Sequence, residues 1–240
     1  MALESYEIIR PEHLHLFKDG LRLYGCDHHW YPMKWRQKNG CGPATATNLL
    51  LYLNKKNNFY GLPYRNLDVC ETLTAMNDVY HFVRPPLLGP HTITQFMNGL
   101  EKLSEHYGIS YKFYYLKISL LPNKRPTIQG VKQFIEHGIQ KDVPIAFFHS
   151  TSDEKDGIEA SQWVTIIGIK SDKETGNVMI QAYDQAASIE INLGKWLETS
   201  KTGGGFVYLC NASMMSLKSE LKGKPNFNAA TFPGKYISKF

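Results

Sequence analysis

The stretch that most constrains this chain is residues 37–53, QKNGCGPATATNLLLYL, in which a cysteine between two glycines precedes an apolar helix. Gly40 and Gly42 permit a sharp turn and a close approach to the sulfur of Cys41. Pro43 suits a first helical turn, because the N–H groups there have no partner inside the helix. A helix-period apolar face follows, formed by Ala44, Ala46, Leu49, Leu50 and Leu53. The pattern predicts that Cys41 lies at the N-terminus of a half-buried helix.

Cys41 is therefore a candidate nucleophile. The unpaired N–H groups and the positive end of the dipole at a helix N-terminus stabilise a thiolate, which is the reactive form of cysteine. The plainer interpretation is a small buried residue that packs the start of the helix, as free cysteines often do. The two glycines, the proline and the buried helix favour the nucleophile.

Composition indicates one globular domain over residues 1–240. The chain is long enough for one sizeable core, and no segment has the composition of a linker between domains. The net charge is only +5 and the basic residues are scattered, so we expect no nucleic-acid partner. The four cysteines form no CxxC pair, which argues against a zinc knuckle or a dense disulfide framework. Because no basic leader or long apolar run is present, we expect no membrane partner and a cytoplasmic location.

A segment rich in histidines and aromatic residues, residues 5–36, precedes the cysteine loop and shows little periodicity. His13 and His15 alternate as neighbours on one face of a strand would, and His28 and His29 follow an aspartate. These side chains are potential metal ligands, but no second cluster has a recognisable ligand spacing. We therefore expect no metal and no cofactor, and an irregular or short-stranded segment that packs over the core or lines a cleft.

The first 140 residues are predicted to be mostly helical. Apolar residues at helical spacing predict a helix over residues 64–80, with Cys70 in its buried face. Thr92 and Thr127 are predicted N-caps of two further helices, because a short hydroxyl side chain precedes an apolar stripe in each case. Between them, the alternating aromatic run at 111–118 predicts a strand.

Short strands make up the second half of the chain. The β-branched and aromatic runs lie at 144–149, 162–170, 177–183, 188–191 and 205–210. The turn SDKETGN joins the second and third of them as a hairpin. Helices first and antiparallel strands afterwards predict an α+β fold, with the Cys41 helix packed on the sheet. The core is expected over about 31–210, and the polar segment 211–240 as a C-terminal extension on the surface.

A cysteine at a helix N-terminus, the strand QWVTIIGI, and an aspartate in QAYDQ after the next strand resemble the papain-like cysteine peptidase superfamily. The likeness is greatest to its bacterial branch of bacteriocin-processing peptidases and covers roughly residues 31–200. It implies a papain-like fold and thiol hydrolase or acyl-transferase chemistry on a peptide or other amide or acyl substrate. It also implies that Cys41 is the nucleophile, that Asp184 orients the base, and that Gln37 supplies an oxyanion-hole amide together with the backbone N–H of Cys41. Asn39 is an alternative amide.

The sequence departs from the family at Gln162, which occupies the head of the strand where the family has its catalytic histidine. A glutamine amide cannot take up a proton near neutral pH, so the normal Cys–His–Asp triad of the family is not present in this sequence. Three interpretations remain: a pseudoenzyme that binds a peptide or acyl group, the natural or engineered loss of a histidine from a competent enzyme, and replacement of that histidine by His149. If strands 144–149 and 162–170 pair as antiparallel neighbours, His149 lies beside Gln162.

Each of the other candidates has a plainer interpretation. An aspartate directly after a strand, such as Asp184, often only forms a turn. Gln37 precedes Cys41 by four residues, a closer spacing than is usual in papain-like enzymes. His149 at the end of a strand is more often hydrogen-bonded at the rim of a sheet than catalytic.

Overall fold

The structure is a computed structural model that describes residues 3–57, 62–64, 68–86, 92–150, 161–200 and 203–212. All structural statements below refer to these residues. The C-terminal extension from residue 213, the loop 151–160 and Leu67 of the predicted second helix lie outside them.

The N-terminal half contains short strands and four α-helices. Its elements are β1 (Leu3–Glu7), the 3-10 helix η1 (Pro11–Leu14), β2 (His15–Lys18), β3 (Leu21–Tyr24), the 3-10 helix η2 (His28–Trp30), α1 (Lys34–Asn39), α2 (Cys41–Lys56), α3 (Val69–Val83) and α4 (Ile93–His106). The C-terminal half contains β4 (Tyr111–Ile118), the 3-10 helix η3 (Pro122–Lys124), α5 (Ile128–Gln140), β5 (Ile145–His149), β6 (Gln162–Asp172), β7 (Val178–Asp184), β8 (Ala187–Asn192), α6 (Leu193–Thr199) and β9 (Gly204–Asn211). The predicted α+β order, with helices first and an antiparallel sheet afterwards, is confirmed.

The main sheet is seven-stranded and antiparallel, in the order β4-β9-β5-β6-β7-β8, with β1 paired to the far end of β6. The long strand β6 therefore has two neighbours on the same edge. Its first residues pair with β5, where His149 lies opposite Gln162, and its last residues pair with β1. A bulge between Ile166 and Gly168 separates the two parts, since an extra residue bends a strand and shifts its pairing.

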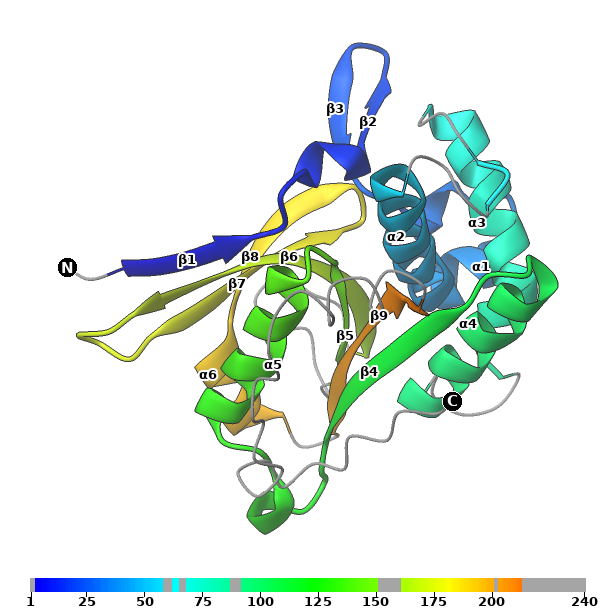
Figure 1. The fold of residues 1–240 in the computed structure, drawn as a ribbon. Coiled ribbons are helices and arrows are strands. Elements are labelled where there is room, and N and C mark those ends of the chain that lie inside the picture. The colour runs from blue at the N-terminus through cyan, green and yellow to red at the C-terminus, as the bar shows by residue number, and fades with distance from the viewer. Residues whose placement is uncertain are drawn as a thin grey trace.

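Helices cover both faces of this sheet (Figure 1), with α1 to α4 gathered on one side and α5 and α6 on the other. On the first face, Phe96 of α4 stacks on Trp163 of β6, with ring centroids 4.2 Å apart. On the second face, Trp196 of α6 meets Phe147 of β5 edge-on at 4.7 Å. Because both faces are covered, β5 and most of β6 are buried along their length, which explains their continuous apolar sequences.

The predicted caps explain where two of the helices begin. Thr92 and Gln95 form a reciprocal capping box at the start of α4, and the Thr127 side chain accepts the backbone N–H of Gly130 at the start of α5. The prediction for α3 was wrong in two respects. The helix begins at Val69 rather than at residue 64, because its N-cap is Asp68, whose side chain accepts the backbone N–H of Glu71. Cys70, in the first turn, is exposed rather than buried.

Candidate functional site

Cys41 is the first residue of α2 and is partly exposed. The residue before it, Gly40, has φ −92° and ψ 0°, a backbone conformation open to other residues. What requires a glycine there is close packing. A Cβ on Gly40 would lie 2.4 Å from the carbonyl oxygen of Arg36 and 2.6 Å from the ring of Tyr31. The glycine therefore lets α1 and Tyr31 pack directly against the turn that presents the thiol.

Asn48 fixes α2 against both the sheet and the segment before η2. Its buried amide nitrogen donates to Thr165 Oγ1 of β6 at 2.9 Å, and its oxygen accepts the backbone N–H of Cys26 at 2.9 Å. Gly25 has φ +79°, and a Cβ there would lie 2.8 Å from the Asn48 amide nitrogen. Only glycine suits both demands, and the loop that leads into η2 is held in place as a result.

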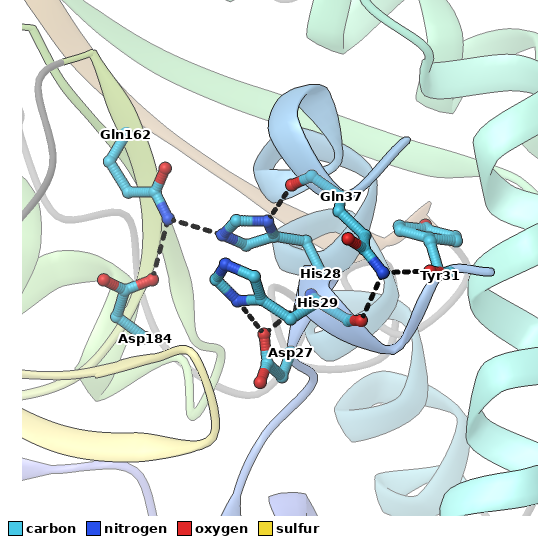
Figure 2. Close-up of polar contacts among 7 residues, drawn as sticks. All are labelled: Asp27, His28, His29, Tyr31, Gln37, Gln162 and Asp184. Atoms are coloured by element: carbon cyan, nitrogen blue, oxygen red, sulfur yellow. Dashed lines mark hydrogen bonds and ion pairs between the residues drawn. The ribbon is translucent and has the colours of Figure 1, made fainter. Parts of the chain in front are cut away.

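Gln162 lies at the centre of a buried hydrogen-bond network that spans four elements (Figure 2). Its amide nitrogen lies 3.1 Å from Asp184 Oδ1, at the end of β7, and 3.1 Å from His28 Nε2, in η2. His28 Nδ1 makes a short hydrogen bond with the backbone carbonyl of Gln37 in α1. His28 and Gln162 are each 3% exposed and Asp184 is 9% exposed. The strand head, the end of β7, η2 and α1 are therefore joined by one chain of polar contacts.

The direction of each hydrogen bond in this network follows from the chemistry of its groups. A carboxylate only accepts, so the Gln162 atom that faces Asp184 is the amide nitrogen, a donor of two N–H groups. The same nitrogen faces His28 Nε2, which must then be the accepting, unprotonated ring nitrogen. His28 Nδ1 carries the proton and donates it to the Gln37 carbonyl. The imidazole is thus held in one neutral tautomer, in which the Nε2 lone pair accepts a hydrogen bond from Gln162.

Gln37 holds η2 on α1 in this structure. Its side-chain nitrogen donates to the backbone carbonyls of His29 at 3.1 Å and of Tyr31 at 2.8 Å. An amide has two N–H groups, so both are engaged by carbonyls. These contacts favour a structural role over the predicted oxyanion-hole donor. The alternative, Asn39, donates to the backbone carbonyl of Trp35 at 3.0 Å.

His149 pairs with Gln162 as the sequence predicts. Its fully buried ring, however, lies 5.7 Å from the ring of Phe147 and 6.2 Å from that of Trp196. The printed contacts of His149 are with aromatic rings on the face that α6 covers. They do not test its distance from Cys41, and His149 as a base for Cys41 stays a prediction.

The histidine-rich segment does not form the arrangement predicted for its first two members. His13 lies in η1 and His15 begins β2, so they are not strand neighbours. Asp27, His28 and His29 each place one possible ligand atom within 4.8 Å of the others. Both ring nitrogens of His28 are engaged, as described above, and His29 Nδ1 lies 2.8 Å from Asp27 Oδ1. A metal ion there would have to break these hydrogen bonds.

From the sequence, His28 is only a potential metal ligand beside His29, and nothing places it in a network with Gln162 and Asp184. It belongs to the run DHHW, where nothing in the local pattern distinguishes a buried histidine from its neighbour. His29 shows the contrast, since its side chain is 49% exposed. The Asp27 side chain accepts the backbone N–H of His29 as the N-cap of η2, and this short turn directs one ring inwards and the other outwards.

Searches of family models and of curated proteins find no match. Among solved structures, UfSP from C. elegans is similar over 87% of this chain and 34% of that chain, with a TM-score of 0.47 and 12% identity. The chain thus spans about a third of the length of that structure. A likeness of this degree carries no argument about function, which rests on the geometry of the site. Among the described residues, the helices are too short or too polar to cross a bilayer.

Proposed function

We propose that the chain is a catalytically silent papain-like domain that binds a peptide or acyl group beside Cys41. One observation supports this most directly. The position of the family's histidine is filled by Gln162, whose amide nitrogen donates to both Asp184 and His28. The group that should take a proton from the thiol is therefore a neutral amide, held as a double donor.

Thiol catalysis needs a group that accepts the proton of the nucleophile and later delivers it to the leaving group. Along the described network, the lone pair of His28 Nε2 accepts from Gln162, and Oδ1 of the Asp184 carboxylate accepts from the same amide. Releasing either group would leave a buried polar atom without its partner, at a cost of about 1–3 kcal/mol. The network is stable as it stands and is not arranged to move a proton.

Binding is still possible at this place. The N-cap of α2 is Gly40, which offers no side chain to the first turn. The N–H groups of a helix start and the positive end of its dipole suit a carbonyl or carboxylate oxygen. A peptide carbonyl or an acyl oxygen is the chemistry expected beside the partly exposed Cys41.

The second candidate is a thiol hydrolase, and the partial exposure of Cys41 at the start of a 16-residue helix favours it. Such a position stabilises a thiolate without a histidine. Turnover would then depend on water or substrate groups for proton transfer.

The test compares the wild-type chain with Cys41→Ala and Gln162→His. We would measure release of aminomethylcoumarin from a pool of peptide amides, hydrolysis of peptide thioesters, and binding of the same peptides labelled with fluorescein. The proposal predicts that wild type and Cys41→Ala have equal hydrolysis rates and that both bind the peptides. A hydrolysis rate that depends on Cys41 in the wild-type chain would instead establish the thiol hydrolase.

A further inference from the structure

A basic groove lies beside the candidate site, on the outer side of α1 and the C-terminal end of α3. It contains a hollow of about 390 Å³, and an adjoining hollow of about 350 Å³ continues it towards α4. The first hollow is lined by Met33, Trp35, Arg36, Tyr80, Arg84, Pro85 and Pro86. The second shares Arg84 and the two prolines and adds Lys102 and Gln95, among others.

The charges in this groove are of one sign. Arg36, Arg84 and Lys102 line it, with His81 at one side, and the described lining residues include no aspartate or glutamate. Basic side chains gathered on a surface attract an anionic partner and speed its association.

Two contacts hold the guanidinium of Arg36 in a fixed orientation in this groove. Its guanidinium donates to Asn77 Oδ1 at 2.8 Å and lies 4.4 Å from the centre of the Tyr80 ring. Tyr80 in turn packs edge-on against Tyr31, behind the turn that presents Cys41. A guanidinium fixed by an amide and an aromatic face loses little freedom on binding a carboxylate, which it contacts through a planar fork of donors.

Exposed apolar side chains border the charges. Trp35 is 48% exposed and Met33 is 57% exposed. Tryptophan, tyrosine, arginine and methionine are the residues enriched where proteins bind one another, and they often dominate the affinity. Their presence around a groove with fixed cations fits a protein segment better than a small free anion.

We propose that this groove binds an acidic segment of a partner protein, in which glutamate or aspartate side chains flank an apolar residue. The carboxylates would pair with Arg36 and Arg84, and the apolar residue would pack on Trp35 and Met33. The chain's own C-terminal segment 213–240 is a poor occupant by charge, since it holds five lysines and one glutamate. The inference does not depend on whether Cys41 is catalytic.

The probe is a fluorescein-labelled peptide, Glu-Glu-Leu-Glu-Pro-Glu, and binding is followed by fluorescence polarisation at low and high salt. The proposal predicts binding that weakens at least about tenfold in Arg84→Glu and in Trp35→Ala, and that weakens as salt rises. Arg84 and Trp35 are both exposed, so both variants should fold, which circular dichroism verifies. Arg22→Glu on β3 is the matched control, because it changes the net charge equally and leaves binding intact.

Three results would overturn the proposal. A lysine peptide of the same pattern that binds as tightly would remove the charge argument. Equal loss of binding in Arg22→Glu and Arg84→Glu would show an effect of net charge alone. Tighter binding of a single-stranded oligonucleotide at the same residues would assign the groove to nucleic acid. Because Cys41→Ala leaves this groove intact, acidic-peptide binding in that variant separates this inference from the proposed function.

Discussion

Replacing Gln162 by leucine tests the hydrogen-bond network by its contribution to stability. Leucine has a similar volume and removes both donated hydrogen bonds, so Asp184 Oδ1 and His28 Nε2 each lose a partner while buried. A hydrogen bond to a charged group contributes about 1.5–3 kcal/mol and a neutral one about 1 kcal/mol. Because the gained apolar contacts offset part of this, we expect the free energy of unfolding to fall by about 2–3 kcal/mol.

The measurement is urea unfolding followed by circular dichroism and tryptophan fluorescence, with the slope against urea checked for constancy. For a chain of this size the melting temperature should fall by roughly 4–12 °C. Gln133→Leu on α5 is the control, because Gln133 is exposed and its replacement should change stability by less than about 0.5 kcal/mol. If Gln162→Leu behaves like this control, the network does not stabilise the fold and the reasoning above is refuted.

Two further predictions concern buried polar groups away from the network. Burial lowers the pKa of His137 to about 4, below its unfolded value of about 6.5. The neutral His137 ring therefore contributes stability above pH 6.5, and this contribution, about 1–2 kcal/mol after allowance for partial exposure, is lost as the pH falls towards 4. Between pH 7 and pH 4.5, the free energy of unfolding in urea should change less in His137→Gln than in the wild-type chain. An equal change in the two proteins would contradict this. Asn48→Ala removes the hydrogen bonds to Cys26 and Thr165. In the same assay it should lower the free energy of unfolding by about 2–4 kcal/mol. A loss below about 1 kcal/mol would show that apolar packing alone fixes α2.

Local signals in the sequence account well for the elements that carry the site. The helix after Cys41, the strand 111–118 and the caps Thr92 and Thr127 depend on periodicity and on the first turn of a helix, which neighbouring residues decide. The pairing of His149 with Gln162 follows from an antiparallel connection between consecutive strands. Each of these could be predicted because few distant residues take part.

The network could not be predicted in the same way. It joins Gln162 to His28 across 134 positions. The His28 ring points into the network because of a 3-10 turn, which hydrophobic periodicity does not predict. The wrong prediction that Cys70 is buried has a related cause, because the N-cap Asp68 starts α3 later than the apolar spacing suggests. Gly40 was singled out for its backbone freedom, yet it is required by contacts with Arg36 and Tyr31 that only the fold creates.

The most direct test of the central claim is the rate of Cys41 alkylation by iodoacetamide at pH 6 relative to pH 8.5. Both wild type and Gln162→His would carry Cys70→Ser, because Cys70 is exposed, and modification would be assigned to Cys41 by peptide mass spectrometry. The account predicts that the wild-type rate falls steeply at pH 6, and that Gln162→His, with an ionisable group beside Asp184, reacts at least about tenfold faster there. Equal rates at pH 6 in the two proteins would contradict it, because Gln162 would then not occupy the place of the missing base.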